Sequence, residues 1–391
     1  MTAASFRPGI TTLVQDHPDW IQGRRVGLVS HPAALDAQGR SSAELLKTCP
    51  GVRLSVLFGP EHGFFGGALA GESVASRRHP VWRIPAYSLY GSARRPSRAM
   101  LKNLDVLVFD LQDLGVRPYT FVSTLRFVLE EAARYGKLVI VADRPIPLPR
   151  VVDGPLPLPA LESFVAAVPV PMCYGMTPGE SAQWIRVALR LDVELRVARM
   201  DGYRRDARRQ PSWPPWVPPS PGIVSWESAM AYPATVCFEA FPHIDHGRAA
   251  GLPFQLFGAS WINGTELCAC LASCGLPGVR FFSHPYTVAG PLHRPRLVDG
   301  VRIVVVDANR FRPIATSVCI VHALQRLYGS GRLWRARAAR SDFFDKLYGT
   351  DRVRRSLLDN EPPLRIARAW QPEVSAFGRS RRQALLYSSS P

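Results

Sequence analysis

Two short stretches, Val106-Leu-Val-Phe109 and Leu138-Val-Ile-Val-Ala142, decide the fold that we expect for this sequence. Both are apolar throughout, which is typical of parallel strands that are buried on both faces of a sheet. Similar runs occur earlier in the chain, at Val26–Ser30 and Leu54–Phe58. The segments between the runs carry apolar residues at three-to-four spacing and are predicted helices, namely Ser41–Lys47, Thr120–Tyr135 and Pro178–Leu189. This alternation predicts an α/β domain with an open, mainly parallel sheet.

A second set of elements follows the proline-rich passage Pro211–Pro221, which contains two tryptophans. Because proline cannot continue a helix or an inner strand, we interpret this passage as a long ordered loop or a crossing between domains. Beyond it, strands are predicted at Val279–Ser283 and Val301–Val306, and helical patterns occur at 266–273, 316–328 and 343–347. We therefore expect two domains, one spanning residues 1–235 and a smaller α+β domain spanning residues 236–391.

The composition is that of a folded protein, since 47% of the 391 residues are apolar and 20% are charged. The net charge of +17 comes mainly from arginine, because only four of the 48 basic residues are lysines. The arginines are spread along the chain, without a basic tail or a known nucleic-acid-binding motif. We therefore expect no specific nucleic-acid binding and favour acidic small ligands, since arginine pairs with carboxylates through two hydrogen bonds.

The sequence also indicates where the protein resides. No apolar stretch approaches the roughly 18 residues of a membrane-spanning helix, so we expect no membrane association. Arg7 and Pro8 stand where a signal peptide would need its apolar core. The seven cysteines are an odd number scattered over a large chain, which favours reduced thiols over a disulfide framework. These features predict a cytoplasmic protein.

Polar clusters follow the predicted strands, at the sheet edge where open α/β sheets bind their ligands. The clusters are Glu61 and His62 after Leu54–Phe58, then Asp110, Asp113, Arg117 and Tyr119 after Val106–Phe109, then Asp143 and Arg144 after Leu138–Ala142, with Tyr174 to Glu180 as a further group. If these side chains converge on one edge, they form an acid-rich pocket with cationic partners.

Each cluster also has a purely structural interpretation. Glu61 with His62 could be a surface turn, and Asp110 could cap the turn that follows its strand. Asp143 and Arg144 could form an internal salt bridge. Glu180 belongs to a helix start in which Thr177 is the expected N-cap, so we assign it a structural role.

No metal and no cofactor are expected. The glycines near residue 65 lack the spacing of a phosphate-binding loop. Cys268, Cys270 and Cys274 lie in an apolar helical stretch without an opposing ligand pair, and we interpret them as buried thiols rather than a zinc site. The segment His243-Ile-Asp245-His246 has no known ligand spacing, and Gly-x-Ser-x-Gly is absent. The carboxylates therefore point to acid–base chemistry.

Taken together, the motifs resemble those of the exo-β-N-acetylmuramidase family. The resemblance is carried by Gly59-Pro-Glu-His-Gly-Phe64, Tyr87-Ser-Leu-Tyr-Gly91, Val106 to Gly115, Arg117-Pro-Tyr-Thr120, Asp143-Arg-Pro145, Gly175 to Glu180, Phe238-Glu239, Gly247-Arg248 and Phe344 to Gly349. These motifs cover nearly the whole chain. The resemblance implies a Rossmann-like N-terminal domain with a smaller C-terminal one, and removal of terminal N-acetylmuramic acid from peptidoglycan fragments.

Carried onto this sequence, the resemblance implies Glu61 as the catalytic acid. Because a glycosidase needs a second carboxylate, Asp113 and Asp110 are the nearest motif candidates, with Glu239 behind them. The lactyl carboxylate of muramic acid requires a cation, for which Arg117, Arg144 and Arg248 are available. The complete expected substrate-binding set is His62, Arg117, Tyr119, Asp143, Arg144, Tyr174, Glu239 and Arg248.

Three positions depart from the family pattern: Tyr174 stands where a histidine is usual, Gly222 where an asparagine is usual, and His246 where a glutamate is usual. We therefore consider two hypotheses. The first is a glycoside hydrolase that acts on a small sugar or muropeptide substrate. The alternative is a non-catalytic or repurposed homologue that binds an acidic sugar or another acidic small molecule.

Overall fold

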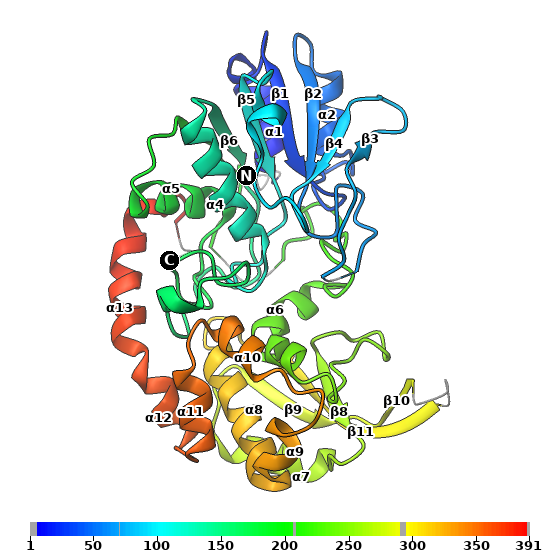
Figure 1. Ribbon diagram of the computed structural model, residues 1–391, viewed down its shortest axis with the longest axis vertical. Helices are drawn as coiled ribbons and strands as arrows, with labels where there is room; N and C mark the ends of the chain where they lie inside the picture. Colours follow the sequence, from blue (N-terminus) through cyan, green and yellow to red (C-terminus); the bar gives the residue numbers. More distant parts are fainter. Residues whose placement is uncertain (1–5, 70, 206–208, 290–294, 389–391) are drawn as a thin grey trace.

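The protein consists of two lobes, one above the other in Figure 1. The structure is a computed structural model that describes residues 6–69, 71–205, 209–289 and 295–388. The upper lobe contains a seven-stranded sheet and the lower lobe a four-stranded sheet. The expected α/β class, with a second domain beside a mainly parallel sheet, is confirmed.

The upper sheet has the strand order β3-β4-β2-β1-β5-β6-β7. All neighbouring strands are parallel except the short edge strand β3, which runs antiparallel to β4. The strands are β1 (Arg25–Ser30), β2 (Arg53–Gly59), β3 (Arg77–Arg78), β4 (Pro85–Ser88), β5 (Val106–Asp110), β6 (Leu138–Ala142) and β7 (Leu195–Ala198). The four predicted strands of this sheet are therefore confirmed, with end residues that differ by at most one.

Helices cover both faces of the upper sheet. They are α1 (Gly9–Asp16), α2 (Ser42–Thr48), α3 (Arg98–Leu101), α4 (Phe121–Arg134) and α5 (Pro178–Ala188). Alternate residues of β5 point to opposite faces. Val106 and Val108 pack in one apolar cluster with residues of α1 and α2, while Leu107 and Phe109 pack in another with residues of α4 and α5. The continuous apolar runs of the sequence thus reflect burial on both faces.

The lower lobe is built on an antiparallel sheet in which the long strand β11 pairs with each of the other three strands. The strands are β8 (Leu256–Ala259), β9 (Val279–Ser283), β10 (Tyr286–Ala289) and β11 (Pro295–Val305). The helices are α6 (Trp226–Thr235), α7 (Gly264–Ser273), α8 (Pro313–Tyr328), α9 (Ser330–Trp334), α10 (Ser341–Tyr348), α11 (Arg352–Leu358), α12 (Pro363–Ala369) and α13 (Gln371–Ser380). Helices α7, α8 and α10 and strands β9 and β11 correspond to predicted elements.

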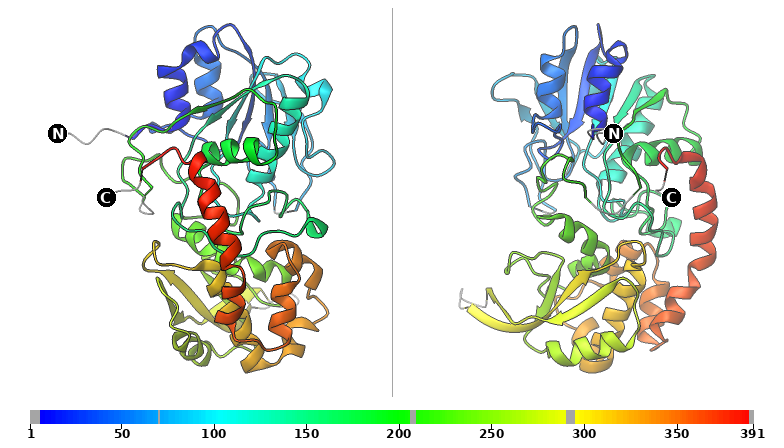
Figure 2. Two further views of the ribbon diagram at one scale, coloured as in Figure 1. Left: turned by 90° about the vertical axis from the view of Figure 1, so that its left-hand side faces the viewer. Right: turned by 180° about the vertical axis from the view of Figure 1, so that it is seen from behind.

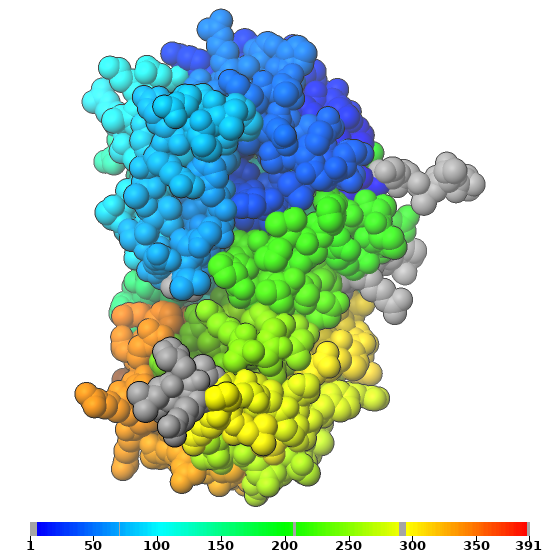
Figure 3. Space-filling view, turned by 90° about the vertical axis from the view of Figure 1, so that its right-hand side faces the viewer, coloured from blue at the N-terminus to red at the C-terminus, as the bar shows by residue number. Residues whose placement is uncertain are grey.

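Two segments connect the lobes. The proline-rich passage forms no helix or strand, as expected, and buries Trp213 against Trp226 and Phe6. In Figure 3 this part of the chain, in green, lies between the blue upper lobe and the yellow and orange lower lobe. Helix α13 then runs along one side of the molecule from the lower lobe to the upper one (Figure 2). The division at residue 235 stays a prediction, and Leu386 and Tyr387, beyond α13, bond to residues of the upper lobe.

Candidate active-site cleft

A cleft of ≈ 690 Å³ lies between the lobes, a volume within the range typical of small-molecule sites. The upper lobe contributes Glu61, His62, Gly71, Tyr90, Arg94, Pro118 to Phe121, and Ser163 to Val165. The connecting segment contributes Ser220 to Ile223, and the lower lobe contributes Tyr232, Phe238, Glu239, Pro242, His246, Arg248, Phe254, Arg340, Phe343 and Lys346. Both lobes are therefore needed to form the site.

Glu61 lies in a tight turn that follows β2. The turn folds back so closely over the strand end that a Cβ atom on Gly59 would come within 2.1 Å of the backbone nitrogen of Phe64. His62, at φ +72°, adopts a left-handed conformation that few side chains tolerate, and its Nδ1 atom lies 2.9 Å from the carbonyl oxygen of Ala68. Together these features fix the Glu61 carboxyl group in the cleft.

Both oxygens of Glu61 accept a hydrogen bond. The hydroxyl of Thr120 donates to Oε2 at 2.7 Å, and the backbone N–H of Gly71 donates to Oε1 at 3.0 Å. Thr120 is the N-cap residue of α4, yet its side chain makes no capping bond. The hydroxyl that would normally satisfy the helix is instead used to hold Glu61 next to the positive end of the helix dipole, an arrangement that suits the charged carboxylate.

Glu239 is the second carboxyl group of the cleft, and it comes from the lower lobe. It lies in a 3₁₀ turn at Val236–Ala240, and a quarter of its side chain (25%) is exposed. Arg248 donates to Oε1 at 3.2 Å, and Arg340 donates to the backbone carbonyl oxygen of Glu239. Burial raises the pKa of Glu239, and the neighbouring Glu61 raises it further, while Arg248 and Arg340 act in the opposite direction.

His246 and the rings of Tyr119, Tyr232 and Phe254 form a wall of the cleft beside Glu61 and Glu239. The Nε2 atom of His246 accepts a hydrogen bond of 2.9 Å from Arg248, and burial together with the Arg248 charge lowers the pKa of His246 to about 4. Tyr232 packs edge-on against Tyr119 and Phe254, with ring centroids 5.8 and 4.8 Å away. The wall combines neutral polar groups with apolar surface, which is the usual character of a sugar or cofactor pocket.

Asp110 and Arg144 lie at the sheet edge but not in the cleft. They form a buried ion pair in which Arg144 Nη2 donates to Asp110 Oδ2 at 3.0 Å, and only 2% of the Arg144 side chain is exposed. Ser42 donates a further hydrogen bond to Asp110. Arg144 thus pairs with the strand-end aspartate of β5, not with its neighbour Asp143.

Asp113 and Tyr174 are also buried and bonded to each other. The Tyr174 hydroxyl donates to Asp113 at 2.6 Å, and the backbone N–H of Leu114 donates at 2.7 Å. Burial nevertheless dominates and raises the pKa of Asp113 to about 6. Neither side chain lines the cleft.

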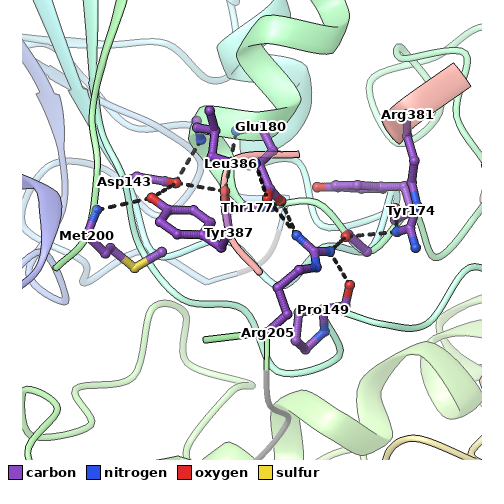
Figure 4. A network of polar contacts seen from close by, with 12 residues as sticks. Asp143, Pro149, Tyr174, Thr177, Glu180, Met200, Arg205, Arg381, Leu386 and Tyr387 are labelled. Carbon is purple, nitrogen blue, oxygen red and sulfur yellow. Dashed lines mark hydrogen bonds and ion pairs between the residues drawn. The ribbon is translucent and has the colours of Figure 1, made fainter. Parts of the chain in front are cut away.

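Asp143 belongs to a polar network that Figure 4 shows from close by. It accepts hydrogen bonds from Thr177, from the backbone N–H of Gly179 and from the hydroxyl of Tyr387 at 2.7, 2.8 and 2.6 Å. Glu180, next to it, forms a capping box with Thr177, the predicted N-cap, and a buried ion pair of 2.6 Å with Arg205. This network joins Leu386 and Tyr387 to the upper lobe.

Arg117 is fully buried and bonded only to backbone oxygens. It donates to the carbonyls of Pro155 and Val170 in the upper lobe and of Leu347 and Tyr348 in the lower lobe, at 2.6 to 3.3 Å. Burial lowers its pKa to about 9. Arg117 therefore joins the two lobes and does not face the cleft.

Of the expected site residues, the cleft brings together Glu61, His62, Tyr119, Glu239 and Arg248. Sequence reasoning missed several further lining residues. Tyr90 and Thr120 lie inside motifs that were quoted for the resemblance, so their motifs carried a usable signal. Arg94, Phe164 and Arg340 carried none, because only the folded chain places them beside Glu61 or Glu239.

The two-lobed fold with its cleft belongs to a known family of sugar-cleaving enzymes. Models of the N-terminal and C-terminal parts of the exo-β-N-acetylmuramidase NamZ match residues 26–227 and 230–387, so the chain belongs to this family, and the resemblance is confirmed.

A named relative makes the assignment more particular. The chain is 34% identical to the peptidoglycan β-N-acetylmuramidase NamZ of Bacillus subtilis (strain 168) over 380 residues, which cover 97% of this chain and 91% of that protein. A crystal structure of a DUF1343 family protein from Bacteroides fragilis is 29% identical, with a TM-score of 0.90, and covers 98% of this chain and 99% of that one. A second protein of the same family and organism is 24% identical with a TM-score of 0.76 over 99% of this chain and 100% of that one, and it shows the fold alone.

Proposed function

We propose that this protein is an exo-acting glycoside hydrolase that removes terminal N-acetylmuramic acid from peptidoglycan fragments, with Glu61 and Glu239 as its carboxylate pair. The observation that supports this most directly is that the cleft holds two carboxyl groups, one from each lobe, in different surroundings. A glycosidase needs one group to protonate the leaving oxygen and a second, charged group on the other side of the scissile bond.

The surroundings divide the two roles. Glu239 is the proton donor in this proposal, because burial and the nearby Glu61 charge raise its pKa. Glu61 is the charged carboxylate, because both of its oxygens already accept hydrogen bonds and it lies at the start of α4. The sequence alone led us to expect Glu61 as the catalytic acid, whereas this assignment makes it the charged carboxylate. The other member of the pair is Glu239 and neither Asp110 nor Asp113.

Substrates with different leaving groups test the assignment. A nitrophenyl N-acetylmuramide has a leaving group that needs little protonation, whereas a natural disaccharide needs a full proton. Glu239→Gln should reduce kcat on the disaccharide by about a hundredfold or more and spare most of kcat on the nitrophenyl substrate. Glu61→Gln should reduce kcat on both substrates. The reverse pattern would return the acid role to Glu61.

The finer statements about location are also proposals. Among the residues that the structure describes, no helix is long and apolar enough to span a membrane. All seven cysteines are free thiols, which fits the reducing conditions of the cytoplasm. We propose a cytoplasmic enzyme that acts in the recycling of cell-wall fragments. Binding of N-acetylmuramic acid without turnover of any β-N-acetylmuramide would instead support the non-catalytic alternative.

A further inference from the structure

Two adjacent arginines, Arg94 and Arg95, lie over aromatic rings in similar ways. The guanidinium carbon of Arg94 lies 4.8 Å from the centre of the Phe164 ring, and that of Arg95 lies 4.0 Å from the centre of the Phe127 ring. Arg95 also forms ion pairs with Glu130 and Glu131. Arg94 forms no ion pair and no hydrogen bond with any residue that the structure describes. Its positive charge is therefore available to a ligand.

Arg94 lines the cleft, whereas Arg95 does not. Within the described residues, each of the other cations in the cleft has a partner. Arg248 is paired with Glu239, Arg340 donates to the backbone carbonyl of Glu239, and Lys346 is paired with Asp342. Glu61, the other acid of the cleft, is held by a hydroxyl and an N–H group and not by a cation. Among the described residues of the cleft, Arg94 is thus the cation that forms neither a hydrogen bond nor an ion pair.

The Arg94 guanidinium lies over the Phe164 ring, and Phe164 in turn packs against Tyr90 near Glu61. The Tyr90 and Phe164 rings have their centres 5.5 Å apart, and Phe164 is almost completely buried. The pKa of Tyr90 is raised to about 12 by burial and by the Glu61 charge, while the Arg94 charge acts against the rise. Tyr90 is therefore close to both charged groups. Since Glu61, Tyr90 and Arg94 all line the cleft, a ligand bound there can contact both Glu61 and Arg94.

We propose that Arg94, supported by Phe164, is a specificity-determining residue that binds a carboxylate of the substrate. This inference rests on the proposed function and adds to it the residue that recognises the acidic group. An arginine suits this task because its planar guanidinium can stack on a ring and still donate two parallel hydrogen bonds to a carboxylate. In a muramic-acid substrate the carboxylate belongs either to the lactyl group or to a peptide attached to it.

The test compares three nitrophenyl substrates on the parent enzyme and on R94Q. The first carries the free lactyl carboxylate, the second carries the lactyl group as its amide, and the third carries a dipeptide with free carboxylates on that group. R94Q should lower kcat/KM about tenfold, mainly through KM, on one of the two acidic substrates and leave the neutral amide unchanged. The acidic substrate that is affected identifies the source of the carboxylate.

R95Q is the matched control, because Arg95 is the same residue type over a similar ring but lies outside the cleft. It should leave the relative kcat/KM values of the three substrates unchanged. A loss in R94Q that is equal on all three substrates, or no loss on any, would overturn the proposal.

A separate measurement distinguishes failure of this inference from failure of the proposed function. If the parent protein cleaves none of the substrates, the glycosidase proposal fails. Calorimetric binding of free N-acetylmuramic acid, of its lactyl amide and of its dipeptide derivative then still tests Arg94. About tenfold weaker binding of one of the two acidic ligands by R94Q, with the amide unaffected, would support the carboxylate site, and equal binding of both acidic ligands by the two proteins would overturn it.

Discussion

The carboxylates that follow the strands of the upper sheet form two groups with opposite surroundings. Asp110, Asp113 and Asp143 are buried, and each accepts hydrogen bonds from two or more groups of the protein. Glu61 is bonded on both oxygens but still lines an open cleft, where Glu239 from the other lobe lies beside it. Position after a strand therefore does not predict whether a carboxylate is buried or faces the cleft, and in our proposal only the carboxylates that face the cleft act on the substrate.

The strongest test of this comparison is Glu61→Gln. General acid–base and electrostatic catalysis by a carboxylate contributes about 10²–10⁴-fold, so kcat should fall by at least about a hundredfold. The glutamine oxygen can still accept from the N–H of Gly71 while its NH2 group donates to the Thr120 hydroxyl, so the melting temperature should change by no more than a few degrees. Steady-state rates and thermal unfolding measure the two effects. Glu266→Gln, at an exposed position of α7 outside the cleft, should change neither.

Asp110→Ala tests the buried group. The substitution leaves the Arg144 guanidinium in the interior without its counter-charge, and breaking a buried pair in this way costs about 3–5 kcal/mol of unfolding free energy. Urea unfolding measures the loss. Asp105→Ala, which removes the exposed ion pair with Arg25 at the other end of the same sheet, should cost much less. Equal losses in the two variants would contradict the distinction between the buried pair and the exposed one.

The raised pKa of Asp113 predicts a smaller effect on the free energy of unfolding, and this effect depends on pH. The pKa of Asp113 is about 6 in the folded protein, whereas its ordinary value is 3.8. Between about pH 4 and 6, Asp113 is therefore protonated in the folded protein and ionised in the unfolded chain. Its contribution to stability is therefore complete below this range and is lost as the pH rises through it, by at most about 1.4 kcal/mol per pH unit.

Asp113→Asn should remove this part of the pH dependence, which urea unfolding at several pH values between 4 and 7 would show as a flatter profile. Asp359→Asn, at an exposed position, is the control and should leave the parent profile unchanged. An unchanged slope in Asp113→Asn would mean that Asp113 is ionised throughout this range, with its donors outweighing its burial.

The upper sheet could be predicted because its signals are local. The central strands are continuous apolar runs, and α5 begins with the capping sequence that was expected. Strand β8 (Leu-Phe-Gly-Ala) is short and contains a glycine, and α6 contains Pro233, so neither has a pattern that favours its actual structure. These elements depend on contacts with distant parts of the chain.

The site could be predicted only in part for the same reason. The motif around Glu61 contains one carboxylate of the cleft, but Asp110, at the end of its own strand, is instead bonded to Arg144 and Ser42 in the interior. Of the three departures from the family pattern, Tyr174 is buried on Asp113, while Gly222 and His246 line the cleft. A Cβ atom at Gly222 would lie 2.9 Å from the Phe254 ring, so the ring occupies the space that a side chain at this position would need. No local pattern reveals such contacts.

Tyr387→Phe should have the smallest effect on stability. It tests whether Tyr387 belongs to the buried hydrogen-bond network around Asp143. The Tyr387 hydroxyl donates to Asp143 and accepts from the backbone N–H of Met200 at 3.1 Å, so its loss removes two hydrogen bonds. Asp143 keeps Thr177 and Gly179 as donors, so the expected cost is only about 1 kcal/mol of unfolding free energy.

Urea unfolding should resolve this loss against Tyr135→Phe, whose hydroxyl forms no hydrogen bond with the part of the chain that the structure describes. Cleavage rates should not change, because Tyr387 lies outside the cleft. A loss of kcat in Tyr387→Phe without a loss of stability would show that Tyr387, beyond α13, affects catalysis in the cleft. Since Tyr387 and Asp143 are 244 positions apart in the sequence, α13 would then link the two lobes in function as well as in structure.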